Sequence, residues 1–234
     1  MVKPTQLHFI EDYPFKYQEV FFVSVQVNDW DAAALEALWG WSLPSSLQDA
    51  IAKRKLEYLA GRLCVQYALR KLGIMPFELC NGQDRSPQWP AELVGSITHA
   101  TYFSFVALAS RGQVQGLGVD TEYFTKRRSM LGLAGQIAVE EEVAMAAYSG
   151  LSVEVFYLLL FSAKESFFKC LYPKVLKYFG FDFAKLSALH FDTADSGSFR
   201  MELLKELPPF KATFTLQGFF RIETERLHTM VVMG

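Results

Sequence analysis

The sequence predicts an α+β protein of two similar halves, each a long helix packed on a small, mainly antiparallel sheet. A long helical segment followed by short strand-like segments occurs before residue 115, and the same order recurs after residue 150. This order is typical of α+β architectures. Hydrophobic residues make up 51% of the 234 residues and charged residues 21%, a globular composition that supports a substantial core. We therefore expect halves over 1–115 and 116–234, related by a pseudo-two-fold axis, with a site near their boundary.

The first half is expected to begin with a strand and a short helix. The segment 21–27 is rich in β-branched and aromatic residues and then alternates apolar with polar residues, as strands do. Asp29 or Asp31 can cap a short helix that Gly40 ends. Apolar residues at helical spacing then predict one long helix over 44–72. The elements expected next are a loop over 81–90 and two neighbouring strands, over 103–109 and 115–120, joined by a turn at 110–112.

The second half is expected to contain a mobile loop, two helices and several short strands. A basic run at 126–128 and two nearby glycines suggest the loop. A helix rich in Ala and Glu follows over 140–148. Ser152 can cap the next helix, which is expected to run to about Leu171 and to be closed by Pro173. The short strands are expected over 190–193, 199–203, 211–216, 219–223 and 227–232.

Asp120 and Glu122 lie two positions apart in a strand-like stretch, so their carboxylates would point to one face. Two close like charges raise one pKa or require a cation, and carboxylate oxygens suit Mg²⁺. The alternative, judged from the spacing alone, is a pair of solvated acids on an edge strand. Other parts of the sequence must decide between these interpretations.

Charge, cysteines and hydropathy limit the class of protein. The formal net charge is -2, so the chain as a whole is no polyanion binder and we expect no nucleic-acid partner. Basic runs at 53–55 and 126–128 are the local candidates for anion contacts. The three cysteines are widely spaced and lack a Cys-x-x-Cys pair, which favours reduced thiols and no zinc site. The chain has no signal-like N-terminus and no apolar run near the ~20 residues that cross a bilayer, so we expect a cytoplasmic protein without a membrane span.

The segment FSAKESFFK, at 161–169, is expected on the long helix of the second half. Glu165 and Lys169 are i and i+4 and share a face, whereas Lys164 lies about 100° around the helix from Glu165. An ordinary helix ion pair is one interpretation. The helix is apolar nearly all round, however, which favours charged groups directed into a cleft. A third carboxylate there could complete a site with Asp120 and Glu122.

Four stretches of the chain together resemble one family. They are LEYLAGRLCVQYALRKLG at 56–73, RSPQWP followed by VGSITH within 85–99, GVDTE at 118–122, and FSAKESFFKCLYP at 161–173. In this order and spacing they resemble the 4'-phosphopantetheinyl transferases, specifically the monomeric two-half kind, closest to the branch with the enterobactin synthetase D component. The resemblance covers the chain from about residue 54 to residue 173.

The resemblance implies a reaction and a metal. Such enzymes bind coenzyme A and Mg²⁺, with Mn²⁺ as an alternative ion. They transfer the 4'-phosphopantetheine group to a serine of an acyl or peptidyl carrier protein and release adenosine 3',5'-bisphosphate. By motif position, Asp120, Glu122 and Glu165 would be the metal ligands. Glu165 would also be the base for the carrier serine, and Lys169 would complete the catalytic residues.

The resemblance also implies ligands for coenzyme A. His99 and Lys169, with Lys164 less firmly, would contact the pyrophosphate. Thr98 stands where the family usually has Ser and keeps the hydroxyl. Guanidinium groups match phosphate oxygens well. The candidates for the adenosine 3'-phosphate region are Arg54, Arg62 and Arg85, with Lys53 and Lys55 as alternatives to Arg54.

Carrier contacts are expected at the basic run 126–128 and at apolar residues within 124–145. Two other functions are considered: a non-catalytic module that binds coenzyme A or a carrier protein, and a Mg²⁺-dependent phosphohydrolase. The retained carboxylates, His99 and Lys169 argue against the first. The second lacks a phosphate-binding Gly-rich loop. The sequence does not identify the carrier or its pathway, whether siderophore, polyketide, lipopeptide or fatty acid.

Overall fold

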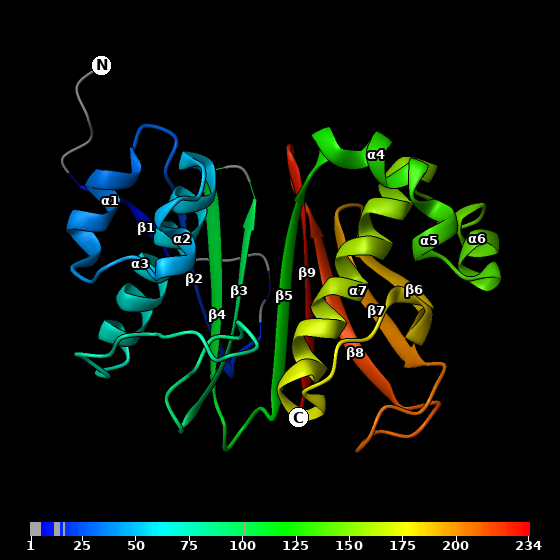
Figure 1. The fold of residues 1–234 in the computed structure, drawn as a ribbon. Helices are drawn as coiled ribbons and strands as arrows, with labels where there is room; N and C mark the ends of the chain where they lie inside the picture. The colour runs from blue at the N-terminus through cyan, green and yellow to red at the C-terminus, as the bar shows by residue number, and fades with distance from the viewer. Residues whose placement is uncertain (1–5, 12–14, 16, 101) are drawn as a thin grey trace. The chain divides into compact units, whose positions relative to one another are not determined.

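The computed structural model describes residues 6–11, 15, 17–100 and 102–234, and the chain forms two compact units, Met1–Ser110 and Arg111–Gly234. Each unit contains a long helix packed on an antiparallel sheet, so the predicted α+β class is confirmed (Figure 1). The units divide after residue 110, whereas the sequence analysis placed the boundary after residue 115. Among the described residues, no helix combines the length and the apolar character needed to cross a membrane.

The N-terminal unit packs its long helix on a four-stranded sheet of order β1-β2-β4-β3. Leu59 and Leu69 of the helix share one hydrophobic core with Val23 and Val106 of the two central strands. The helix carries apolar residues at helical spacing on one face, and every second side chain of a strand points to the same face of the sheet. These two patterns make the packing possible. The elements are β1 Phe9–Ile10, β2 Val20–Gln26, α1 Ala32–Trp39, α2 Ser45–Gln48, α3 Ala52–Lys71, β3 Leu93–Ala100 and β4 Phe103–Ser110.

The short helix α1 is confirmed, but the single helix predicted over 44–72 is wrong. Asp31 caps α1 by accepting a hydrogen bond from the Ala34 N–H at 2.8 Å, and Gly40 ends it in a left-handed conformation with φ 83°. The chain then forms one turn, α2, before α3 begins at residue 52. Ile51, between them, has an extended backbone and is 73% exposed. No apolar contact holds this residue in a helix.

The prediction that the strands over 103–109 and 115–120 are neighbours is also wrong. Strand β4 pairs with β2 along one edge and with β3 along the other. Both edges are therefore occupied, and the following strand, β5 (Gly116–Tyr123), pairs with the C-terminal strand β9 (Arg226–Met233) instead. Local strand signals identified both strands but not their partners.

The C-terminal unit packs one long helix, α7 (Val153–Val175), on a five-stranded antiparallel sheet of order β5-β9-β8-β7-β6 (Figure 1). Phe156, Phe167 and Leu171 of the helix are fully buried against the sheet core. As predicted, Ser152 caps the helix by accepting from the Val155 N–H. The other elements are η1 Phe124–Lys126, α4 Arg127–Gly132, α5 Ala134–Ile137, α6 Glu140–Ala146, η2 Phe181–Phe183, β6 Ala184–Thr193, β7 Ser196–Leu203 and β8 Thr215–Ile222.

Three local predictions for this unit are corrected. The segment after β5 forms η1, α4 and α5 instead of a mobile loop, because Met130 and Ile137 are buried in the core and anchor these short helices. Pro173 lies inside the last turn of α7, which continues for two more residues. The strand predicted over 211–216 is replaced by a turn in which the rings of Phe210 and Phe214 lie in contact, tilted by 32°, and β8 starts only at residue 215.

Strand β5 and helix α7 approach each other more closely than ordinary side chains allow. A Cβ atom on Gly118 would lie 1.8 Å from the carbonyl oxygen of Ser166 and 2.7 Å from the backbone nitrogen of Cys170. Both atoms belong to the helix backbone, so no side-chain rotation can relieve the clash. Glycine at this position therefore fixes the distance between the strand and the helix.

We expect Gly118→Ala to lower the free energy of unfolding by about 3 kcal/mol, because the added methyl must displace α7. Urea unfolding followed by circular dichroism measures the change. Gly132→Ala is the matched control, because no atom outside its own helical turn and chain neighbours lies within 4 Å of the Cβ position of Gly132. A Gly118→Ala protein as stable as the parent would contradict the close approach.

Candidate active site

Strand β5 holds two buried carboxylates side by side. Asp120 and Glu122 are 6% and 7% exposed, so the alternative of two solvated acids is wrong. Glu122 Oε2 lies 2.6 Å from the ammonium of Lys126. Burial, and next the charge of Asp120, nevertheless raise the pKa of Glu122 to about 7. The strand therefore concentrates negative charge that its surroundings compensate only in part.

Helix α7 brings Lys169 and Glu165 to the same carboxylate pair. The Lys169 ammonium donates to Asp120 Oδ1 at 2.7 Å and to the Val119 carbonyl at 3.0 Å. Burial raises the pKa of Glu165; Lys169 opposes this rise and the charge of Asp120 adds to it. Glu165 and Asp120 therefore lie within electrostatic reach of each other, as the sequence analysis expected.

The three carboxylates suit a divalent cation chemically. Asp120, Glu122 and Glu165 offer hard oxygen donors, and positive charge among them would offset the burial and the repulsion by Asp120 that raise the pKa of both glutamates. The described residues contain no group of three or more His, Cys, Asp or Glu side chains already arranged to hold a metal. The donor set thus fits Mg²⁺ or Mn²⁺, while metal coordination stays a prediction.

Lys164 lies apart from these carboxylates, in the interior of the C-terminal unit. It is 3% exposed, and its ammonium donates to the carbonyls of Ile137 and Phe181, at 2.7 and 3.2 Å, and to Glu142 Oε2 at 2.8 Å. Three N–H donors thus meet three acceptors. This arrangement argues against Lys164 as a pyrophosphate ligand and makes it a buried link between α7, α6 and η2.

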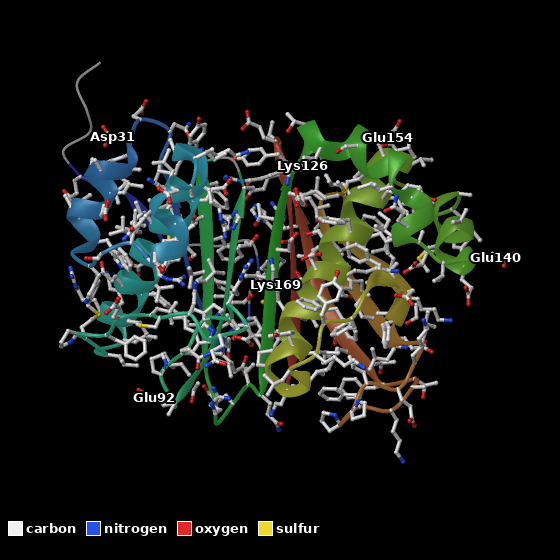
Figure 2. The ribbon with its side chains drawn as sticks, in the orientation of Figure 1. Asp31, Glu92, Lys126, Glu140, Glu154 and Lys169 are labelled. Carbon is white, nitrogen blue, oxygen red and sulfur yellow. The ribbon has the colours of Figure 1, made fainter. Side chains whose placement is uncertain are left out.

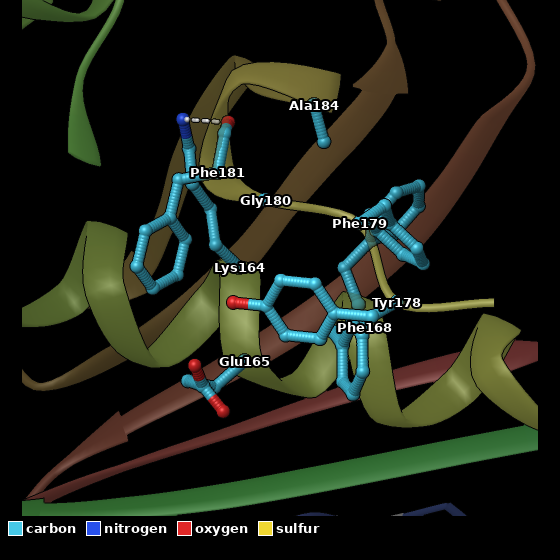
Figure 3. A pocket seen from close by; sticks show the side chains of 9 residues that line it. Lys164, Glu165, Phe168, Tyr178, Phe179, Gly180, Phe181 and Ala184 are labelled. Atoms are coloured by element: carbon cyan, nitrogen blue, oxygen red, sulfur yellow. Dashed lines mark hydrogen bonds between the residues drawn. The ribbon is translucent and has the colours of Figure 1, made fainter. Parts of the chain in front are cut away.

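A small, largely aromatic pocket adjoins Glu165 (Figure 3). Its volume is about 90 Å³. The ring of Phe168 lies 5.0 Å from that of Phe179 and 5.6 Å from that of Tyr178, measured between centroids. Tyr178 is 77% exposed, so one wall of the pocket faces solvent. An apolar surface open to solvent therefore adjoins a carboxylate with a raised pKa.

The N-terminal unit holds a separate polar cluster around His99. Arg54 Nη1 lies 3.1 Å from His99 Nε2. Since a guanidinium can only donate, Nε2 accepts and the proton of the neutral ring is on Nδ1. Nδ1 faces Glu57 Oε2 at 3.6 Å, and the same carboxylate lies near Arg54. The structure therefore brings two of the predicted coenzyme A ligands together.

The other two predicted arginines have different surroundings. Arg62 is 5% exposed, lies 4.4 Å above the centroid of the Tyr58 ring and donates a hydrogen bond to Asn81. Burial lowers its pKa, although a guanidinium stays charged. Arg85 is exposed on the loop over 81–90, where its backbone is left-handed with φ 68°. Arg62 is thus held in place, and Arg85 is presented to solvent.

Of the residues near His99, Thr98 was a predicted ligand and Glu57 was not predicted. Thr98 is 3% exposed and lies on the face of β3 opposite to that of His99, because side chains alternate along a strand. Its hydroxyl therefore does not join the His99 cluster. Glu57 was not among the predicted residues, although its position three residues after Arg54, on the same helix face, was a usable signal.

Comparisons with known proteins identify the family of this chain. Residues 43–109 match the 4'-phosphopantetheinyl transferase N-terminal domain, and residues 116–231 match the 4'-phosphopantetheinyl transferase superfamily. Enterobactin synthase component D of Salmonella typhi is 35% identical over 171 residues, which cover 71% of this chain and 69% of that protein. The protein of the same name from Salmonella typhimurium is 34% identical over 81% of this chain and 76% of its own length.

A third relative comes from another group of bacteria. The 4'-phosphopantetheinyl transferase Svp of Streptomyces mobaraensis is 34% identical over 66% of this chain and 61% of its own length. The matched regions include the strand with Asp120, the helix with Glu165 and the cluster around His99. The chain therefore belongs to the 4'-phosphopantetheinyl transferase superfamily.

Proposed function

We propose that Asp120, Glu122 and Glu165 are the carboxylates with which this transferase holds Mg²⁺, or Mn²⁺, against the pyrophosphate of coenzyme A. The observation that carries the proposal is that Asp120 lies within electrostatic reach of both Glu122 and Glu165, in surroundings that withdraw all three carboxylates from water in large part, opposed by the ammonium groups of Lys126 and Lys169. When bound there, a divalent cation would neutralise charge that develops on the leaving phosphate.

The chain's own groups supply the remaining chemistry of transfer from coenzyme A to the serine of a carrier protein. Glu165 accepts the proton of the serine hydroxyl, directly or through a water molecule, and its raised pKa brings it closer to the pH at which it must act. The serine oxygen forms the new bond to the β-phosphorus of coenzyme A. The pyrophosphate bond breaks, and adenosine 3',5'-bisphosphate leaves. Lys169 contacts the phosphate oxygens during this exchange.

The aromatic pocket beside Glu165, with a volume of about 90 Å³, would contact one part of the pantetheine arm. That arm carries a dimethyl-substituted carbon and a chain of two amides, which suits a surface of Phe168, Phe179 and Tyr178 with an open side. The Glu165 carboxylate borders the same pocket. Seating the arm there would therefore place the reacting phosphate near the proposed base.

The His99 cluster would bind the anionic nucleotide end of coenzyme A. We assign His99 to the pyrophosphate and Arg54, Arg62 and Arg85 to the 3'-phosphate region. Arg54 and His99 are adjacent and exposed enough to reach a ligand, with 49% and 39% of their side chains accessible. Arg62 is held rigidly over Tyr58, which limits the entropy lost when it binds.

The alternative of a non-catalytic binding module is not favoured, because the relatives are named as synthase components and transferases. We propose a carrier protein as the second substrate and a cytoplasmic monomer as the working form. Three free cysteines, of which Cys64 and Cys170 are buried, fit a reducing compartment. Transfer assays with carrier proteins from several pathways would identify the pathway that this enzyme serves.

An exposed apolar surface on the small helices is the proposed contact for the carrier. Leu131 of α4 and Val143 of α6 are 39% and 51% exposed, and Tyr148 just after α6 is 73% exposed. Helices α4 and α6 both pack on α7, which carries Glu165. Lys126 adds positive charge at the start of this segment. An acidic carrier helix with apolar residues would complement this surface.

Incubation with coenzyme A, Mg²⁺ and an apo carrier protein should add one phosphopantetheine to the carrier, seen by intact mass. We expect Glu165→Gln to lower kcat by about 10²–10⁴, because it removes the base and a metal ligand together. Glu140→Gln, at an exposed position of α6, is the matched control. No transfer to any carrier, or a normal rate for Glu165→Gln, would refute the assignment.

His99→Ala should raise KM for coenzyme A about tenfold, with a smaller effect on kcat, because the imidazole contacts a part of the substrate that is bound throughout. Steady-state kinetics with coenzyme A as the varied substrate measure this split. The exposed His190 provides the control variant, His190→Ala. An unchanged KM for His99→Ala would assign His99 a structural role only.

Val143→Asp should raise KM for the carrier protein about tenfold and leave KM for coenzyme A unchanged, because the new charge repels an acidic carrier helix. Kinetics with the carrier as the varied substrate test this. Ile10→Asp, at a residue that is 56% exposed in the N-terminal unit, controls for the general effect of a surface charge. Equal effects of both substitutions would place the carrier elsewhere.

A further inference from the structure

Three hydroxyl groups buried between α7 and the sheet lead to the Asp120 carboxylate. Ser162 and Ser166 lie one helical turn apart on α7, and Thr229 lies directly opposite Asp120 in strand β9. All three hydroxyl-bearing residues are fully buried. Buried hydroxyls are costly unless they are hydrogen-bonded, so their arrangement beside a candidate metal ligand requires an explanation.

The distances connect the hydroxyls into one chain. Ser166 Oγ lies 2.7 Å from Thr229 Oγ1, which lies 2.9 Å from Ser162 Oγ. Ser162 Oγ in turn lies 2.9 Å from Asp120 Oδ2. Two backbone carbonyls are alternative acceptors for the same hydroxyl protons: that of Ser162 lies 2.8 Å from Thr229 Oγ1, and that of Thr229 lies 3.2 Å from Ser166 Oγ.

Proton counting gives this chain a direction. A hydroxyl has one proton to donate, and an ionised carboxylate only accepts. Ser162 must therefore donate to Asp120, so Thr229 is the donor in any bond to Ser162 Oγ, and it divides its single proton between that oxygen and the Ser162 carbonyl. Ser166 likewise divides its proton between Thr229 Oγ1 and the Thr229 carbonyl. Each bond polarises the next, and the last is charge-assisted. The chain thus presents its positive end to Asp120 Oδ2.

The same carboxylate is held on its other oxygen by Lys169, at Oδ1. Helix α7 therefore holds both oxygens of Asp120, through Ser162 at Oδ2 and Lys169 at Oδ1. We propose that Ser162, backed by Thr229 and Ser166, is a positioning residue that orients Asp120 for binding the divalent cation. This inference rests on the proposed function, because it assigns Ser162 an effect on the affinity for that cation.

The test compares Mg²⁺ affinity in the full-length parent, Ser162→Ala and Asp120→Asn. Isothermal titration of Mg²⁺ into protein saturated with coenzyme A, without carrier, measures affinity independently of activity. A titration into coenzyme A alone is subtracted. We expect Ser162→Ala to weaken Mg²⁺ binding about tenfold, since residues that orient metal ligands commonly contribute at least this much. The Mg²⁺ concentration for half-maximal transfer should shift by the same factor, while KM for the carrier stays unchanged.

Thr229→Val and Thr229→Ser provide a second pair that keeps the test decisive if Ser162→Ala does not fold. Valine has nearly the shape of threonine but no hydroxyl, so Thr229→Val should weaken Mg²⁺ binding, whereas Thr229→Ser should restore it. Ser187→Ala removes a surface hydroxyl that bonds the Arg200 carbonyl and serves as the control.

The outcomes separate the two proposals. If the parent binds Mg²⁺ and Asp120→Asn abolishes binding, the metal assignment holds. Unchanged affinity in Ser162→Ala, or in Thr229→Val where Ser162→Ala is unfolded, then overturns the positioning role alone. If Asp120→Asn binds Mg²⁺ as the parent does, the metal assignment fails and the role of Ser162 fails with it.

Discussion

The close approach of strand β5 to helix α7 is the constraint on which the candidate site depends. At Gly118 the strand lies against the carbonyl of Ser166 with no room for a Cβ atom. Asp120 follows two residues along the strand, and Glu165 directly precedes Ser166 on the helix. The contact that closes the core of the C-terminal unit therefore also sets the separation of two proposed metal ligands. Stability and function are coupled here because one backbone distance serves both.

The close approach of β5 to α7 also affects how the carboxylates of β5 are neutralised. Asp120 and Glu122 each have an ammonium partner, in Lys169 and Lys126. These partners differ in burial: the side chain of Lys126 is 46% exposed and that of Lys169 is 26% exposed. Water screens an exposed ammonium more strongly, so it compensates less of the burial cost of its carboxylate. Burial and the charge of Asp120 therefore outweigh Lys126, and the pKa of Glu122 is raised although Lys126 lies 2.6 Å away. Figure 2 shows both lysines on the C-terminal unit, Lys169 on α7 and Lys126 beyond the end of β5.

Local patterns in the sequence were enough to predict several of the elements but not their partners. The Asp31 cap, the Ser152 cap and the strand with Asp120 depend on neighbouring residues, and all three are confirmed. The pairing of β5 depends on which edges are free, and β4 has none. Likewise, the helix containing Lys164 is apolar nearly all round, so its sequence alone could not show which charged residue points inward. Lys164 points inward because its ammonium bonds to Glu142, which lies 22 residues away in the chain.

The site residues divide in the same way along the segment at 161–169. Positions 162, 166 and 169 recur at intervals of four and three residues, so Ser162, Ser166 and Lys169 face the sheet, and all three bond to β5 or β9. Lys164 lies outside this face and bonds to α6 and the segment around η2. Glu165 borders the aromatic pocket. One short helical segment thus serves packing, charge compensation and the proposed proton transfer, with Lys164 on a different face from the other polar residues. The role of each residue depends on the element that its face of α7 meets. The helical period of the segment, rather than its composition, therefore decides which residue has which role.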